Sequence, residues 1–183
     1  SSDWYRINKE YESMKLELNS DWTDNFSTKI LISDTDVSNP NTPVGATTIG
    51  EVGIRVASGG TVFFGPDQYR HANQIETNRK QYEIAGYYDI GNHAIKLGYK
   101  VVENDMFNMF SRNSLGEYDY NSIDDFIAGN LKELDYRNAD TNNPLDAAGR
   151  FNMDFTIIYL QDTWDISPDL TARIGFRYEE IGM

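Results

Sequence analysis

The sequence predicts an all-β chain that forms the antiparallel wall of a transmembrane β-barrel, with about six long strands, short turns and long loops. Three observations support this fold class. Apolar and polar residues alternate along the chain, short connections alternate with long ones, and the alternating runs are long. Aromatic residues make up 13% of the 183 residues. Such a content argues against disorder, because disordered chains are poor in aromatic side chains.

The alternation places three hairpins at about residues 10–34, 71–103 and 151–180. Their apolar faces comprise Met14, Leu16, Leu18 and Trp22 in the first, Tyr82, Ile84, Tyr88, Ile95, Leu97 and Tyr99 in the second, and Leu170, Ala172, Ile174, Phe176 and Tyr178 in the third. Only residues 155–160 are ambiguous, because they are apolar on both faces. The runs reach the length of about nine to eleven residues that a tilted membrane strand needs.

The connections within and between the hairpins differ in length. The second hairpin turns at Gly91-Asn92, which is typical of a tight two-residue loop. The links between hairpins, about 35–70 and 104–150, are long, and compact soluble domains rarely carry two such loops. Outer-membrane barrels, in contrast, have short turns on the periplasmic side and long loops outside. The first link contains residues 39–43, Asn-Pro-Asn-Thr-Pro, which we expect to end the strand ladder.

Two short helices are expected in the second long loop. Ser122 can cap the first, with Asp125 three residues later and Gly129 at its end. The second begins at Asn143-Pro144, because proline is favoured at the first helical position.

Composition excludes several function classes. The net charge of −13 argues against nucleic acid as a partner, because phosphates need clustered Lys and Arg. The absence of cysteine excludes disulfides and thiolate chemistry. We find no nucleophile elbow, dinucleotide-binding or phosphate-loop motif, and we expect no catalytic residues, no metal site and no cofactor. The two histidines are His71 and His93, and we expect a structural role for His93, because a lone histidine is only a weak indicator of a site.

The second long loop carries the candidate ligand-binding residues, because loops on a rigid scaffold often carry recognition. We predict that Tyr118, Tyr120, Asp124 and Tyr136 contribute to a ligand-facing surface. The alternative is that the tyrosines pack the loop upon itself. Glu117, Asp119, Asp124 and Asp125 could also gather around calcium, a cation that prefers oxygen ligands. Against this, Asp125 fits a helix cap and the calcium-loop pattern is absent.

Several segments together resemble the Oar-like TonB-dependent receptors of the outer membrane. These segments are Arg70-His71-Ala72-Asn73, Gly91-Asn92-His93, Leu97-Gly98-Tyr99, Phe107-Asn108-Met109-Phe110, Gly116-Glu117-Tyr118, Ser122-Ile123-Asp124-Asp125-Phe126, residues 146–151, Tyr159-Leu160-Gln161-Asp162-Thr163-Trp164, Leu170-Thr171 and Gly175-Phe176-Arg177-Tyr178. The similarity extends from Gly59 to Glu180 and rests on their order and spacing, since no single segment is specific.

The resemblance implies a location in the outer membrane of a Gram-negative bacterium and a barrel of about 22 strands around a plug domain. It also implies uptake of a scarce ligand of unknown identity, driven by the TonB system through parts that lie outside this chain. Outer-membrane lipid would be the other partner. Because about six strands cannot enclose a plugged lumen, we expect this chain to be a fragment of a larger barrel.

Two other function classes are compatible with the same strands. A soluble or surface β-domain that binds glycan or protein would bury the apolar face on a core. An enzyme on a β-scaffold is the third hypothesis, and paired carboxylates would be its catalytic groups. We expect the chain not to be an enzyme, because 29 acidic residues make chance pairs inevitable.

Overall fold

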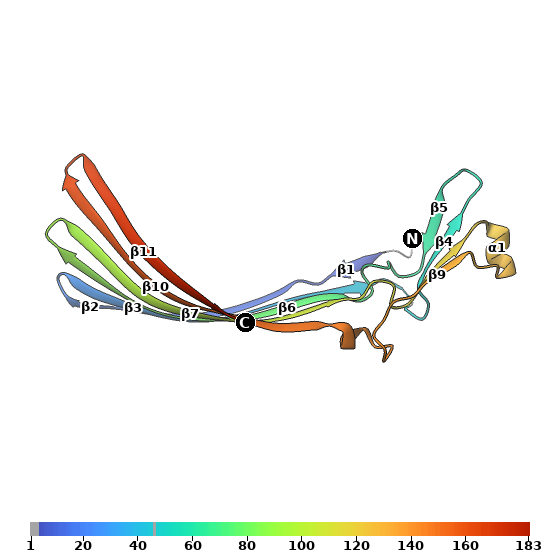
Figure 1. Cartoon of the computed structure of the whole chain (residues 1–183), viewed down its shortest axis with the longest axis horizontal. Coiled ribbons are helices and arrows are strands. Elements are labelled where there is room, and N and C mark those ends of the chain that lie inside the picture. Colours follow the sequence, from blue (N-terminus) through green and yellow to red (C-terminus); the bar gives the residue numbers. More distant parts are fainter. Residues whose placement is uncertain (1–3, 46) are drawn as a thin grey trace. The chain divides into compact units, whose positions relative to one another are not determined.

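The computed structural model describes residues 4–45 and 47–183 and confirms the predicted all-β architecture (Figure 1). Its strands are β1 (Tyr5–Ile7), β2 (Glu10–Thr23), β3 (Phe26–Pro43), β4 (Glu51–Arg55), β5 (Thr61–Phe64), β6 (Asn73–Ile90), β7 (His93–Phe110), β8 (Glu117–Tyr120), β9 (Glu133–Asp135), β10 (Gly149–Ser167) and β11 (Leu170–Gly182). The helical elements are α1 (Ile123–Ala128) and the 3₁₀ turn η1 (Pro144–Ala147). Within the described part of the chain, neither helical element has the length and apolarity needed to cross a membrane.

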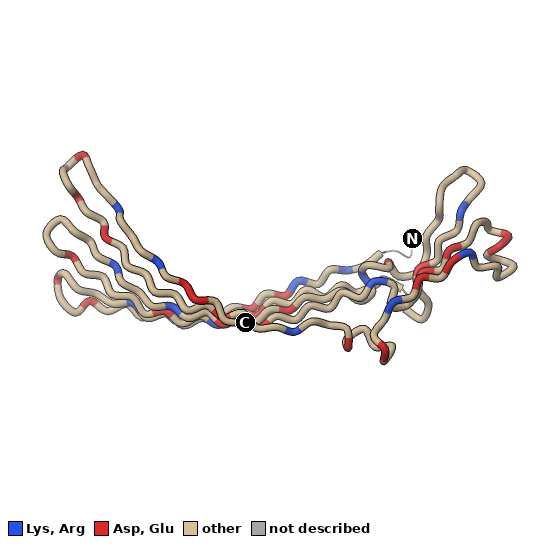
Figure 2. The backbone as a smooth tube through the Cα atoms, viewed as in Figure 1, with Lys and Arg blue, Asp and Glu red and all other residues tan. Residues whose placement is uncertain are grey.

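The six long strands form three consecutive hairpins, β2-β3, β6-β7 and β10-β11, which lie side by side (Figure 1). Within the described residues, the sheet has the order β1-β3-β6-β7-β10-β11, and β2 also pairs with β3. The hairpins turn at 24–25, 91–92 and 168–169, and the second of these turns is the predicted Gly91-Asn92 loop. Acidic residues lie at or near these turns, as Figure 2 shows.

The strands run further than the alternation predicts. Strand β3 continues to Pro43, β6 begins at Asn73 and β7 ends at Phe110, so both links between hairpins are shorter than expected. The expectation that residues 39–43 end the ladder is wrong. Strand β1 pairs with this segment. The carbonyl of Pro40 still accepts a hydrogen bond, 3.2 Å from Asn8 N, so proline removes a donor without ending the pairing.

The long loops contain structure that the alternation did not reveal. Strands β4 and β5 from the first loop and β8 and β9 from the second form a four-stranded sheet of order β5-β4-β8-β9. Strands β4 and β8 pair in parallel, with Val52 opposite Tyr118. These strands have only three to five residues each, too few for a periodic signal. The expected helices are present: Ser122 caps α1, Gly129 ends it in the left-handed conformation, and Asn143 caps η1.

The chain forms two compact units, which we name by their content. The hairpin unit comprises residues 11–36, 77–106 and 151–183, and the loop unit comprises 4–10, 37–45, 47–76 and 107–150. In the hairpin unit, pairing partners share one face of the sheet. Ile158 lies opposite Tyr178, and Leu160 lies opposite Phe176. We call this the apolar face, and its large side chains are widely exposed.

The opposite side of the hairpin unit is the polar face. Tyr159 lies opposite Arg177, and Thr163 lies opposite Arg173. The ambiguous segment 155–160 is therefore resolved, because Ile158 and Leu160 belong to the apolar face while Ile157 and Tyr159 belong to the polar one. Ile157 is only 4% exposed, which shows that an apolar residue can lie beneath the long side chains of the polar face.

Candidate functional sites

One of the predicted tyrosines, Tyr120, belongs to an aromatic cluster that includes Phe126 of helix α1. The ring of Tyr120 meets Phe126 edge-to-face at 5.2 Å, and Phe126 meets Phe64 in the same way at 5.6 Å. Such edge-to-face pairs stabilise by about 0.5–1.5 kcal/mol beyond the area they bury. Tyr118 lies two residues before Tyr120 on β8 and is half-buried. Packing of the loop upon itself therefore accounts for part of the tyrosine pattern.

The four predicted ligand-binding residues are not brought into one pocket. Tyr120 lines a cavity of about 160 Å³, together with Gly53, Arg55, Thr61, Phe63, Glu117, Asp119 and Lys132. Tyr118, Asp124 and Tyr136 do not line this cavity. Asp124 lies exposed in the first turn of α1, and the hydroxyl of Tyr136 donates to Asn142 Oδ1 at 2.8 Å.

The acidic residues of the second loop have separate local partners. Asp125 completes the cap of helix α1, because its amide donates to Oγ of the capping residue Ser122 at 3.0 Å while that hydroxyl donates to the Asp125 carboxylate. Glu117 instead accepts from Gln68 and Asn113. Across residues 4–45 and 47–183, the structure contains no group of three or more His, Asp or Glu side chains arranged to hold a metal ion.

A buried polar network connects strands β4 and β8 of the four-stranded sheet in the loop unit. Gln68 Nε2 donates to Glu51 at 2.9 Å and to Glu117 at 2.8 Å, and its carbonyl oxygen accepts from Arg112 at 2.7 Å. Glu51 and Gln68 are nearly inaccessible to solvent. Because a buried polar group without a partner is costly, this network fixes the positions of the loop strands.

An exposed ion pair lies at the end of β9. Arg137 donates to both carboxylate oxygens of Asp135, at 3.0 and 2.8 Å. These hydrogen bonds hold the pKa of Asp135 below its ordinary value and raise the pKa of Arg137.

Both histidines have hydrogen-bond partners. His71 Nε2 lies 2.8 Å from Ser114 Oγ, and its Nδ1 lies 3.0 Å from the carbonyl of Asp67. His93 stacks on Trp164 with ring centroids 5.3 Å apart, and its Nδ1 lies 2.8 Å from the carboxylate of Asp162. Each arrangement connects segments that are distant in sequence, which agrees with a structural role.

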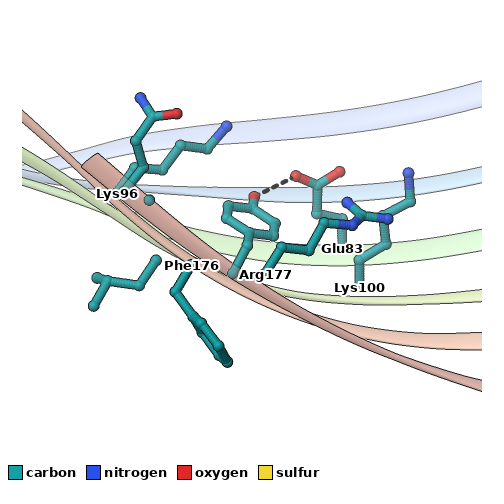
Figure 3. Close-up of a pocket in the computed structure, with 9 residues that line it drawn as sticks. Glu83, Lys96, Lys100, Phe176 and Arg177 are labelled. Atoms are coloured by element: carbon teal, nitrogen blue, oxygen red, sulfur yellow. Dashed lines mark hydrogen bonds between the residues drawn. The ribbon is translucent and has the colours of Figure 1, made fainter. Parts of the chain in front are cut away.

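The polar face of the hairpin unit carries a second candidate site. A cavity of about 430 Å³ is lined by Glu83, Lys96, Lys100, Tyr159, Leu160, Gln161, Gly175, Phe176 and Arg177. Figure 3 shows Glu83, Lys96, Lys100 and Arg177 on one side of the strands, whereas the ring of Phe176 points to the other. We call this the cationic pocket.

Tyr159 contacts several other residues in and beside this pocket. Its hydroxyl donates to Glu83 at 2.8 Å, and the ammonium of Lys96 lies 5.1 Å from its centroid. The ring lies directly over Gly98, where a Cβ atom would overlap it. Lys96 also lies 5.5 Å from the centroid of Tyr87. Aromatic faces attract cations, so the two rings hold the ammonium over the strand.

Sequence reasoning found this site only in part. Alternation correctly indicated that Arg177 belongs to the polar side, but it gave no reason to connect Arg177 with Lys96 and Lys100. The signal that could have found it is the row of alternate residues Lys96, Gly98 and Lys100, in which one glycine separates two cations. Such a glycine in a strand often marks a close approach of another group.

Comparison with known proteins decides the family. The model of the family described as "Outer membrane beta barrel domain" matches residues 11–182. The chain belongs to this family. Among solved structures it is similar to the outer membrane transporter YddB from Escherichia coli, with a TM-score of 0.63 and 12% sequence identity. The match covers 97% of this chain and 22% of that transporter, so the chain spans about a fifth of its length. No curated protein matches the sequence.

Membership of the outer membrane beta barrel family places the chain in the outer membrane and gives its sheet the role of barrel wall. The apolar face has the dimensions of such a wall. From Trp22 back to Met14 it extends eight residues, or about 26 Å along the strand, close to the apolar band of about 25 Å in outer-membrane barrels. Trp22 and Trp164 lie near the short turns, where aromatic girdles occur.

Proposed function

We propose that this chain is part of the barrel of a TonB-dependent receptor, of the Oar-like kind, that takes up a scarce ligand across the outer membrane. The observation that carries the proposal is the combination of membrane-length hairpins with structured long loops. Strands β6, β7 and β10 have 18, 18 and 19 residues, and the two loops pair with each other through β4 and β8. Similarity to an outer membrane transporter over 97% of the chain supports it.

The proposal assigns a partner to each face of the hairpin unit. The apolar face contacts lipid, because large residues such as Ile174 and Phe176 are each 65% exposed there. The polar face borders the lumen or a plug domain in another part of the protein. The hairpin turns face the periplasm, and the long loops face outward, following the usual arrangement of bacterial barrels.

Ligand capture is proposed for the outward loops. Tyr120 is the best supported of the four predicted residues, because it lines the loop cavity together with Lys132 and Arg55. Tyr118 lies on the same short strand, two residues before Tyr120. Asp124 and Tyr136 are exposed and can contact a ligand that covers the loops, although they lie outside the cavity. The role is binding rather than catalysis.

The experiment uses the native polypeptide that contains this chain, extracted from outer membranes in detergent. We expect its mobility on a gel to change on boiling, and we expect the periplasmic domain of TonB from the same cells to capture it. A heat-modifiable barrel that TonB does not bind would refute the receptor while preserving the fold. A species that stays monomeric in the absence of detergent would favour a surface β-domain instead.

A further inference from the structure

Cations are gathered on the polar face of the hairpin unit, in a chain whose net charge is −13. Lys96, Lys100 and Arg177 line the cationic pocket, which contains one carboxylate, Glu83. Counted as formal charges, these four residues give 3 − 1 = +2. A positive site in so acidic a chain attracts anions locally, because nearby charges act more strongly than distant ones that salt screens.

A neighbouring cavity continues the same positive surface. It has a volume of about 320 Å³ and shares Lys100 and Arg177 with the cationic pocket. Its other charged residues are Arg79 and Glu179, so it also carries 3 − 1 = +2. The two cavities form one cationic row along the polar face.

The cations of this row differ in how they are paired. Arg177 is paired with Glu179 through a hydrogen bond of 2.7 Å. Lys96, Lys100 and Arg79, in contrast, form no ion pair with any carboxylate of the described residues within 4.0 Å. The carboxylate of Glu83 is engaged by the Tyr159 hydroxyl. Two lysines therefore face the cationic pocket with their charge uncompensated by a direct partner.

The spacing of the lysines defines what they can bind. Their Cα atoms are four residues apart on β7, or about 13 Å along the strand. Gly98 lies between them without a side chain, and Tyr159 occupies the space above it. The two long, flexible lysine side chains can converge over this ring. Their compact ammonium charges match the oxygens of carboxylates and phosphates.

We propose that Lys96, Lys100 and Arg177 form a binding site for an oxyanion group, a phosphate or a carboxylate, of the solute that this barrel carries. The inference rests on the proposed receptor function, because the solute must reach the polar face. It gives that function a substrate class, a solute with at least one oxyanion group. Tyr159 positions Lys96 and provides the aromatic floor of the site.

The test titrates pyrophosphate, a small multivalent oxyanion, into the native polypeptide in detergent and follows the ³¹P line width. We expect saturable broadening that sulfate reverses and that chloride at equal ionic strength does not. The double variant Lys96→Gln/Lys100→Gln should weaken binding at least tenfold. The control is Lys15→Gln, which removes one positive charge from the same face, at a lysine paired with Glu17 at 2.8 Å. It should change the affinity less than twofold.

Charge-preserving variants keep the proposal falsifiable. Lys96→Arg/Lys100→Arg should retain binding within about threefold, which separates charge from packing. The site is refuted if the unaltered protein does not broaden the pyrophosphate signal, or if Lys15→Gln weakens binding as much as the double variant. Heat-modifiable mobility and TonB capture are measured on the same samples. A barrel that binds TonB but not pyrophosphate would remove the oxyanion site alone, and loss of both would remove the receptor as well.

Discussion

Gly98 is the position where the hairpin unit should be most sensitive to a single added methyl group. A Cβ atom at this position would overlap the ring of Tyr159, so Gly98→Ala must displace the ring. Displacement breaks the hydrogen bond from Tyr159 to Glu83 and moves the ring away from Lys96. A hydrogen bond to a charged group contributes about 1.5–3 kcal/mol, and an exposed cation–π contact about 0.5–1 kcal/mol.

Tyr159 is only half-buried, so solvent replaces part of what the displaced ring loses. We therefore expect Gly98→Ala to lower the free energy of unfolding by about 1–3 kcal/mol, the usual range for overpacking. The matched control is Gly175→Ala on the same face. Its Cβ atom would meet no atom closer than 3.4 Å, which is ordinary contact. This variant should be neutral or slightly stabilising, since alanine restricts the unfolded chain.

Denaturant unfolding of the native polypeptide in detergent, followed by fluorescence, measures both variants. A third measurement isolates the ring. In a Tyr159→Ala background, Gly98→Ala should no longer destabilise, because the added methyl group has nothing to displace. Equal effects of Gly98→Ala and Gly175→Ala would contradict the packing argument. So would a full effect of Gly98→Ala in the absence of the Tyr159 ring.

Three further predictions address the apolar face, an ion pair and a helix end. Ile174→Arg should destabilise the barrel in lipid by about 2–4 kcal/mol, because its side chain faces the bilayer, whereas Thr171→Arg on the polar face should be tolerated; denaturant unfolding in lipid vesicles compares them. Arg137→Gln should raise the pKa of Asp135 toward its ordinary value. The ion pair stabilises the folded state at neutral pH and loses this effect on acidification, so the variant should lack this pH-dependent stabilisation. Carboxyl ¹³C NMR measures the titration of Asp135. Gly129→Ala should destabilise α1 by about 1–2 kcal/mol through backbone strain alone, since no atom lies within 4 Å of the added Cβ, and amide exchange in α1 reports it.

The long hairpins could be predicted because one physical requirement is repeated at every second residue. A strand between an apolar and a polar environment must alternate apolar and polar side chains. The apolar row of Tyr82, Ile84 and Tyr88 follows this alternation. The turns were predictable for a similar reason, since Gly91-Asn92 supplies the backbone conformation of a tight loop. The helix cap Ser122 was also correct, because capping depends on a local hydrogen bond.

Contacts between distant segments could not be predicted in the same way. Strand β4 pairs with β8 across more than sixty positions, and neither strand is long enough to show a period. The pairing of the proline-containing end of β3 could not be predicted, because it depends on β1, a partner of only three residues. Sequence alone also gave no means to separate tyrosines that pack, such as Tyr120 against Phe126, from tyrosines that bind.

The strand register connects the membrane wall to the cationic row. Lys96 and Lys100 share a face because they are an even number of residues apart, and the same parity directs Leu97 and Tyr99 to the apolar face. A shift of β7 by one residue would exchange the two sets. It would place both lysines toward lipid, at a cost of about 2–4 kcal/mol each near the midplane. The register that directs the apolar side chains toward lipid therefore also places both lysines on the polar face. Insertion of the apolar face into the membrane and assembly of the proposed oxyanion site thus favour the same strand pairing.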